Sequence, residues 1–337
     1  MLIQLTAFFA GLALIIWSAN LLITGAIGIA QRYRISQLII GMVIVGLGTS
    51  APELFVSMLA ALQGSTEAAW GNAIGSNIAN IGLGLGLAAL VIPIHIKHHI
   101  LCKKFSMLGI AILVVWLLAM DWQLDFQDVL ALLSTLGQTT QVQTNFELGF
   151  VDGLLLLLVL FVLMYWMVRT ADEYEDDGQD RHREGWPHIL IGIAVLVGAA
   201  ELIVWSAIGI ANRFGVSELL VGLTLTALGT SLPEIVTSLV SAWKKRQDIA
   251  VGNILGSNLF NGLGVIGAIA MVGDSQMRSE VLYRDFLVNA MITLLLLILF
   301  LIPQRYCLYR VKGVLILLFF SAYIVLLYQQ EVSAVLR

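Results

Sequence analysis

Long apolar segments, separated by short polar stretches, dominate the chain. Ten of these segments approach the length of about 20 residues that a helix needs to cross a bilayer. The alternating ten-residue strands of a membrane β-barrel are absent from the sequence, so the pattern predicts an all-α membrane protein. The ten transmembrane helices are expected at residues 3–30, 36–62, 68–93, 105–120, 148–168, 188–212, 217–242, 249–273, 283–302 and 311–328.

Two polar stretches divide the apolar pattern. Residues 121–147 contain no Lys or Arg, and we expect them to form a loop with a short helix on the outer surface. Residues 169–187 include seven acidic residues, which is typical of a solvated linker. The sequence therefore predicts an N-terminal five-helix unit at 1–168, an acidic linker at 169–187 and a C-terminal five-helix unit at 188–337.

Composition agrees with a membrane location and excludes several classes of protein. Of the 337 residues, 59% are hydrophobic and 12% are charged, against about 45–50% and about 25% in a soluble domain. The net charge of −4 and the lack of a basic stripe exclude nucleic-acid binding. Cys102 and Cys307 lie far apart without metal-ligating neighbours, which excludes a disulfide framework and a zinc site. No basic residue precedes the first apolar segment, so we expect a retained helix and not a cleaved signal peptide.

The distribution of basic residues predicts how the helices are oriented. Lys and Arg concentrate in cytoplasmic loops. If the N-terminus lies outside, 14 of the 18 basic residues fall on the inner side, and the exceptions are Arg213, Arg278, Arg284 and Arg337. We therefore expect a multi-pass protein of the cell (inner or plasma) membrane, with both termini outside and the central linker in the cytoplasm.

The chain contains two copies of two motifs, offset by 181 residues. Gly-Thr-Ser-x-Pro-Glu occupies 48–53 and 229–234, and Gly-Asn-x-x-Gly-Ser-Asn-x-x-Asn occupies 71–80 and 252–261. Each half has five expected helices. Because five is odd, the second half enters the membrane from the opposite face, which predicts inverted repeats. Inverted repeats are typical of secondary transporters, whose substrate site lies near the midplane between the copies.

The first motif places Glu53 and Glu234 near the middle of expected spans, where an ionisable side chain is costly and marks a functional site. Pro52 and Pro233 lack a backbone donor and thereby free carbonyl groups one turn earlier. Hard cations such as Ca²⁺ and Na⁺ prefer carboxylate, carbonyl and hydroxyl oxygens. These oxygens are supplied by Thr49, Ser50 and Glu53 in one copy and by Thr230, Ser231 and Glu234 in the other. A glutamate that is hydrogen-bonded only for packing is an alternative for one copy, but explains two symmetric copies poorly.

The second motif places amides and a hydroxyl on one helix face. Its polar residues are spaced four apart, as Asn72, Ser76 and Asn80 in the first copy and Asn253, Ser257 and Asn261 in the second. The glycines at 71, 75, 252 and 256 would let a neighbouring backbone approach closely. A face used only for helix packing is the alternative. It does not explain polar positions that recur in register with the glutamates, so we favour ion coordination.

Together the two motifs resemble those of the cation/calcium antiporter superfamily, most closely its prokaryotic sodium/calcium exchangers, over the whole chain. The resemblance implies that Ca²⁺ and Na⁺ are transported substrates and that no cofactor takes part. It implies that Ca²⁺ is held by Glu53, Glu234, Thr49 and Thr230. It implies that Na⁺ uses the glutamates with Ser50, Ser231, Ser76, Ser257 and the carbonyl groups of Gly46 and Ala227.

The resemblance also implies a central polar pair, Asn80 and Asn261, with Asn72, Asn253, Pro52 and Pro233 in supporting positions. The family often has an aspartate at the position of Asn261. The asparagine found here leaves the ion stoichiometry and any potassium dependence open.

The sequence thus predicts an antiporter that exchanges Ca²⁺ for Na⁺ by alternating access, in which the helices at 3–30 and 188–212 slide across a core of motif helices. A Ca²⁺/H⁺ antiporter, whose glutamates would carry protons, is the first alternative, and a cation channel is the second. An enzyme ranks last, because the expected spans contain no Ser/His dyad, paired aspartates or His-x-x-x-His. The sequence does not indicate an oligomeric state.

Overall fold

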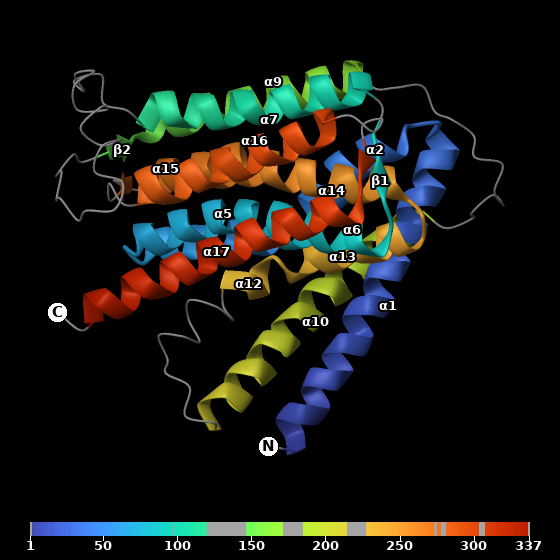
Figure 1. Cartoon of the computed structure of the whole chain (residues 1–337), viewed down its shortest axis with the longest axis horizontal. Coiled ribbons are helices and arrows are strands. Elements are labelled where there is room, and N and C mark those ends of the chain that lie inside the picture. Colours follow the sequence, from blue (N-terminus) through green and yellow to red (C-terminus); the bar gives the residue numbers. More distant parts are fainter. Residues whose placement is uncertain are drawn as a thin grey trace.

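The structure is a computed structural model that describes residues 2–96, 98–119, 146–170, 185–213, 227–272, 275–277, 281–302 and 307–335. These residues are almost entirely helical (Figure 1). Within these described ranges, seven helices are long and apolar enough to cross a membrane, and a bent pair of helices adds an eighth candidate. The protein is therefore an all-α membrane protein, as the hydrophobic pattern predicts.

Two long helices, α1 (Leu2–Tyr33) and α10 (Trp186–Arg213), pack against each other. They run antiparallel, because Gly11 of α1 lies against Ile203 of α10 whereas Leu22 lies against Gly192. Glycine permits this approach, since a Cβ on Gly11 would lie 2.7 Å from Cγ1 of Ile203. Figure 1 shows the pair crossing the other helices at a steep angle, with the N-terminus at its free end.

The segment 37–62 forms a span that is broken in its middle. It consists of α2 (Gln37–Ile39), the π-helical η1 (Ile40–Val45), α3 (Gly46–Thr49) and α4 (Ala51–Leu62), with a bend of 40° around Ser50. The corresponding segment of the second half contains α12 (Ala227–Thr230) and α13 (Leu232–Trp243). Residues 214–226, and with them the beginning of the expected span 217–242, lie outside the described residues.

Two continuous helical segments occupy the centre of the bundle. The first runs through α5 (Thr66–Ala79), η2 (Asn80–Leu85) and α6 (Gly86–Val91), and the second through α14 (Gln247–Leu259), η4 (Phe260–Val265) and α15 (Ile266–Val272). In the most apolar stretch of each segment, 72% and 78% of the residues are buried inside the protein. In α9 (Phe150–Arg169) and α17 (Arg310–Val335) the corresponding share is 28%. A π-helical turn widens a helix and is frequent at functional sites. Both turns begin within one residue of Asn80 or Asn261.

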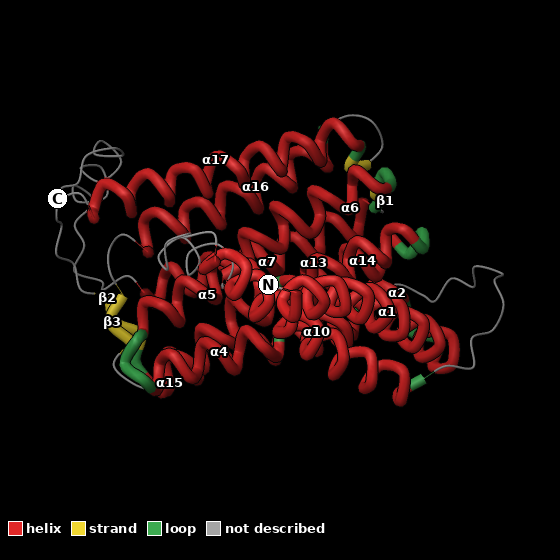
Figure 2. Tube along the Cα trace, turned by 90° about the horizontal axis from the view of Figure 1, so that it is seen from below, coloured by secondary structure: helices red, strands yellow, loops and turns green. Residues whose placement is uncertain are grey.

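The remaining helices, α7 (His98–Ala119) and α16 (Leu287–Leu301), complete the bundle, and α16 is preceded by the π-helical η5 (Val281–Phe286). Figure 2 shows α16 and α17 along one side and α4 and α15 along the opposite side. Two short antiparallel strand pairs join helix ends. They are β1 (Ile94–His95) with β4 (Cys307–Leu308), and β2 (Phe146–Leu148) with β3 (Ser275–Met277).

The observed helices differ from the expected spans in several respects. The spans expected at 36–62 and 217–242 are interrupted at Ser50 and Ser231. The helix expected at 105–120 begins at His98, and residues 146–148, at the end of the expected loop and the start of the next expected span, belong to β2. Strand pairing satisfies backbone groups that a connecting segment would otherwise leave unpaired. The surface helix expected within 121–147 and the interior of the 169–187 linker lie outside the described residues.

Candidate functional site

Both copies of the Gly-Thr-Ser-x-Pro-Glu motif lie where a helix is interrupted. Ser50 separates α3 from α4, and Ser231 separates α12 from α13. Pro52 and Pro233 occupy the first turn of the following helix, where a missing N–H costs least. Because proline cannot donate to the carbonyl one turn earlier, the preceding helix ends there. At membrane depth such a break is tolerated only where it faces the protein interior or a polar cavity.

The glutamates of the two motifs meet in the core from opposite halves of the chain. Glu53 and Glu234 are both fully buried. Ser50 donates a hydrogen bond to Oε1 of Glu234 at 2.8 Å, so a hydroxyl of one half reaches the acid of the other. Ser231 lies near Glu53, but its hydroxyl has no hydrogen-bond partner among the described residues. Within the same part of the chain, both oxygens of Glu53 and Oε2 of Glu234 also lack hydrogen-bond partners.

These unpartnered oxygens determine what the site can bind. Burying an ionised carboxylate that has no partner costs roughly several kcal/mol of free energy. The site therefore needs positive charge, either cations or protons, to balance its acids. The neighbouring groups offer oxygens, which hard cations prefer. Among the residues that the structure describes, no three His, Cys, Asp or Glu side chains cluster as they would around a transition metal.

Two threonines connect the halves. Thr49 donates to Oδ1 of Asn253 at 3.2 Å, and its counterpart Thr230 donates to Oδ1 of Asn72 at 3.1 Å. Thr49 and Asn253 belong to different motifs in different halves, and so do Thr230 and Asn72. Ser257 makes a further connection, because its hydroxyl donates to the carbonyl oxygen of Gly46 at 3.1 Å. Each first motif is therefore bound to the second motif of the opposite half.

The glycines of the second motif bring two backbones together on one side of the site. A Cβ on Gly252 would lie 3.0 Å from the Met42 nitrogen, and a Cβ on Gly256 would lie 2.6 Å from the Met42 Cα. The close approach expected from the sequence is therefore present between α14 and η1. Around Gly71 and Gly75, no described atom lies within 4 Å of such a Cβ.

The expected central pair is not joined directly. Asn80 donates to Oδ1 of Asn258 at 3.1 Å, whereas Nδ2 and Oδ1 of Asn261 have no partner among the residues with described positions. Within the described part of the chain, no hydrogen bond connects Asn80 with Asn261. Ser76 is buried, and its hydroxyl has no hydrogen-bond partner in the described ranges. Ala227 is the first residue of α12.

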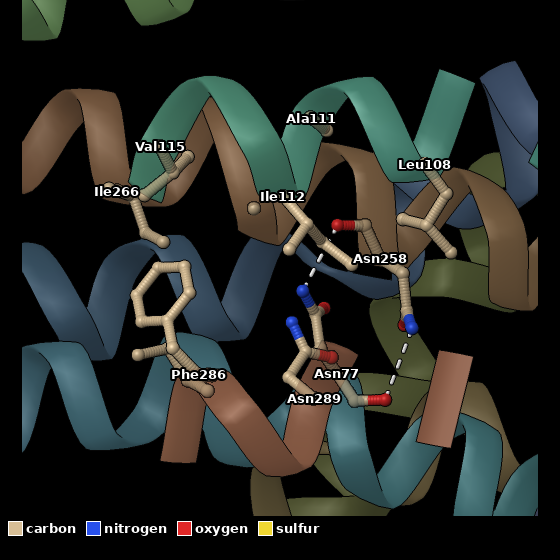
Figure 3. Close-up of a pocket in the computed structure, with 11 residues that line it drawn as sticks. Asn77, Leu108, Ala111, Ile112, Val115, Asn258, Ile266, Phe286 and Asn289 are labelled. Carbon is tan, nitrogen blue, oxygen red and sulfur yellow. Dashed lines mark hydrogen bonds between the residues drawn. The ribbon is translucent and has the colours of Figure 1, made fainter. Parts of the chain in front are cut away.

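Sequence analysis does not single out the asparagine pair that joins the halves most directly. Nδ2 of Asn77 donates to the Asn258 carbonyl, and Nδ2 of Asn258 donates to the Asn77 carbonyl, both at 3.1 Å (Figure 3). Beside them, Asn289 and apolar side chains complete a cavity of about 10 Å³, which is room for about one water molecule. The 181-residue offset between Asn77 and Asn258 is the signal that could have found the pair.

Two serines also escape the sequence analysis. Ser57 and Ser238 follow Glu53 and Glu234 by one helical turn and are fully buried. Each contacts the amide of the second motif in its own half. Their four-residue spacing from a repeated glutamate, together with the 181-residue offset, was available in the sequence.

Comparison with known proteins covers nearly the whole chain. The profile of the family described as sodium/calcium exchanger protein matches residues 3–169 and 185–329. The candidate antiporter CaxA of Alkalimonas amylolytica is 36% identical over 97% of this chain and 99% of its own length. The inner membrane protein YrbG of Escherichia coli is 33% identical over 88% of each chain.

A solved structure has the same fold. The sodium-calcium exchanger NCX_Mj, soaked with 2.5 mM Na⁺ and 0.1 mM Ca²⁺, matches with a TM-score of 0.79 and 26% identity, over 96% of this chain and 98% of that one. The family match, the sequence relatives and the shared fold agree with a buried site of carboxylate, hydroxyl and amide oxygens. The chain belongs to the sodium/calcium exchanger family, whose members are membrane transporters of cations.

Proposed function

We propose that this protein is a secondary antiporter that exchanges Ca²⁺ for Na⁺. The observation that carries the proposal is the pair of fully buried glutamates, Glu53 and Glu234, which come from different halves and have three carboxylate oxygens without a hydrogen-bond partner in the described part of the chain. Two ionised carboxylates balance the charge of one Ca²⁺ ion, and the surrounding oxygens suit a hard cation. NCX_Mj, which shares the fold, is a sodium-calcium exchanger.

The proposed ligands follow the family resemblance. Ca²⁺ is assigned to both glutamates and to the two threonines that bridge the halves. Na⁺ is assigned to the glutamates with Ser50, Ser231, Ser76, Ser257 and the carbonyl groups of Gly46 and Ala227. The bonds from Ser50 to Glu234 and from Ser257 to Gly46 support this set, because they already gather its members from both halves. The two glutamates carry two negative charges, and the other ligands are neutral. Because each Na⁺ carries a single charge, more than one Na⁺ has to replace one Ca²⁺.

The charge of the site supplies the coupling. An empty site carries two negative charges, and moving it through the membrane interior is costly. Bound cations cancel that charge, so the transition between inward and outward access is least costly when the site is loaded. Exchange of one ion against the other follows, because the return step also needs cations.

The proposed architecture is ten transmembrane helices in two inverted repeats, 1–168 and 188–337, joined by the 169–187 linker. Reciprocal contacts support it: the Thr49–Asn253 and Thr230–Asn72 bonds exchange places under the 181-residue offset. The counterparts α1 and α10 are antiparallel, so the rotation axis that relates them is perpendicular to both helices. For helices that span a membrane, this axis lies in the membrane plane.

The same pair, α1 and α10, is proposed to move during transport. On the site side of α10, a Cβ on Gly48 would lie 3.1 Å from Cγ1 of Ile193, and a Cβ on Gly229 would lie 3.4 Å from Cβ of Val204. α10 therefore touches the motif segments of both halves through aliphatic side chains. Such contacts are not directional, so the pair can slide across the site and expose one side at a time.

Transport by the purified protein in liposomes tests the function. An Na⁺ gradient at constant pH should drive uptake of radioactive Ca²⁺, and a pH gradient without Na⁺ should not. Uptake driven by the pH gradient alone would establish the Ca²⁺/H⁺ alternative, in which protons neutralise the glutamates. Ca²⁺ flux that needs no counter-ion gradient would indicate a channel.

Orientation is tested separately with reporter fusions. The bias of basic residues supports external termini and a cytoplasmic linker. A reporter after residue 178 should therefore report the cytoplasm, and reporters after residue 140 and at the C-terminus should report the outside. The same location for 140 and 178 would contradict the inverted repeat.

A further inference from the structure

Ser57 is a buried hydroxyl that the proposed ion ligands do not include. It lies one turn after Glu53 in α4, accepts a hydrogen bond from Nδ2 of Asn72 at 2.9 Å and donates to the Ala69 carbonyl at 3.3 Å. Nδ2 of Asn72 also lies 3.3 Å from the carbonyl oxygen of Glu53. On the other side of the amide, Oδ1 accepts the bond from Thr230, which belongs to the opposite half.

Ser238 has the same environment in the second half. It lies one turn after Glu234 in α13, accepts from Nδ2 of Asn253 at 2.9 Å and donates to the Ala250 carbonyl at 3.4 Å. Nδ2 of Asn253 donates to the Glu234 carbonyl at 3.0 Å, and its Oδ1 accepts from Thr49. Every bond of the first set is therefore repeated at an offset of 181 residues, which local packing alone does not require.

These bonds determine which way each asparagine amide points. An amide group has two donor hydrogens on nitrogen and acceptor positions on oxygen, and the two ends have almost the same shape. The serine hydroxyl gives its single hydrogen to a backbone carbonyl, so it can only accept from the asparagine. The NH₂ group must therefore face the serine, and Oδ1 must face the threonine of the opposite half.

We propose that Ser57 and Ser238 are positioning residues for transport: each orients an asparagine so that the threonine of the opposite half is held beside the ion site. This inference rests on the proposed function, in which Thr49 and Thr230 are Ca²⁺ ligands. Ser57 acts on Thr230 through Asn72, and Ser238 acts on Thr49 through Asn253. Each half thereby controls a ligand that the other half supplies.

Calorimetric titration of the purified protein with Ca²⁺ in Na⁺-free buffer measures this effect without transport. Ser57→Ala removes the acceptor of one hydrogen of the partly buried Asn72 amide and should raise the Kd for Ca²⁺ about tenfold. Ser57→Thr keeps the hydroxyl and should restore binding to within about threefold of the wild type. Ser57→Cys, a weak donor and acceptor, should give an intermediate Kd and serves if the alanine variant does not fold.

A double-mutant cycle separates positioning from general destabilisation. Ser57→Ala and Thr230→Val break the same chain of bonds. The Kd of the double variant for Ca²⁺ should therefore not exceed the higher of the two single-variant Kd values. Ser57→Ala with Thr49→Val breaks two independent chains, and their effects on Kd should multiply. If Ser57→Ala acted only by destabilising the whole protein, its coupling with Thr49→Val would equal its coupling with Thr230→Val.

Wild-type Kd values in both Ser57→Ala and Ser57→Cys, or equal coupling of Ser57 to Thr49 and Thr230, would overturn the inference. Glu53→Gln in the same titration tests the proposed function on its own. If Glu53→Gln still binds Ca²⁺ as the wild type does, the ion-site assignment fails. If Glu53→Gln loses binding while Ser57→Ala keeps it, only the role of the serine fails.

Discussion

The two copies of the glutamate motif share a signature but hold their acids differently. Oε1 of Glu234 accepts a hydrogen bond from Ser50 at 2.8 Å. Among the residues that the structure describes, both oxygens of Glu53 and the hydroxyl of Ser231 have no hydrogen-bond partner. A repeated motif therefore does not produce a symmetric site. The protein itself stabilises the Glu234 end, whereas the Glu53 end relies on whatever positive charge it binds.

The largest expected effect comes from removing either charge. Glu53→Gln and Glu234→Gln should each lower Ca²⁺ exchange by about 100-fold or more, because one carboxylate no longer balances Ca²⁺. The two variants should differ in thermal stability without ions. Glu53→Gln removes an acid with no hydrogen bond and should raise Tm, whereas Glu234→Gln also alters the acceptor of Ser50 and should raise it less. Exchange near the wild-type rate in either variant would contradict the assignment of Glu53 and Glu234 as Ca²⁺ ligands.

The next effect concerns the packing of the second motif in the second half. Gly256→Ala pushes a methyl group against the Met42 backbone and should destabilise the protein by about 1–3 kcal/mol. Thermal unfolding of the variant and of the wild type in the same detergent measures the loss. An unchanged Tm would show that α14 and η1 can separate without cost.

A smaller difference is expected between the two serines of the first motif. Ser50→Ala removes the hydrogen bond to Glu234 and should destabilise the ion-free protein by about 1.5 kcal/mol. Ser231→Ala removes a hydroxyl without a partner, so its effect should stay within about 0.5 kcal/mol. Denaturation without Na⁺ and Ca²⁺ provides the measurement. A reversed order would mean that Glu53 is the better stabilised acid.

The smallest effect is expected at Asn261. Its amide has no hydrogen-bond partner, whereas Asn80 donates to Asn258. Asn80→Ala should therefore cost about 1 kcal/mol of stability and Asn261→Ala close to none.

A neutral asparagine at position 261 adds no negative charge for an extra monovalent cation. Exchange in liposomes should thus proceed equally with K⁺ and with an impermeant substitute, and strict K⁺ dependence would show that Asn261 has another role.

Much of the fold was predictable because its signals are local. Apolar length marks the membrane helices, and the proline of each first motif marks the interruption at Ser50 or Ser231. The two glutamates stand out because an acid in an apolar span is rare. The offset of 181 residues pairs Thr49 with Thr230 and Asn72 with Asn253 before any contact is known.

Cross-half contacts were not predictable from these signals. The family resemblance implies that Asn80 and Asn261 form a central polar pair, and the tertiary structure adds that Asn77 and Asn258 exchange hydrogen bonds across the centre. A π-helical turn begins within one residue of Asn80 and of Asn261, and helical spacing in the sequence does not reveal such turns.

The sequence by itself determined the class of protein, the approximate helices, the two repeated motifs and the acids of the site. These follow from hydrophobic length, proline chemistry and the cost of charge in an apolar span. Only the tertiary structure decided which motif contacts which. It also decided that Ser50 contacts Glu234, whereas Ser231 makes no hydrogen bond to Glu53 within the described residues. It further placed Ser57 and Ser238 against the asparagines that they orient. Hydrogen bonds between distant segments depend on differences of about an ångström in helix packing, and no local pattern encodes those differences.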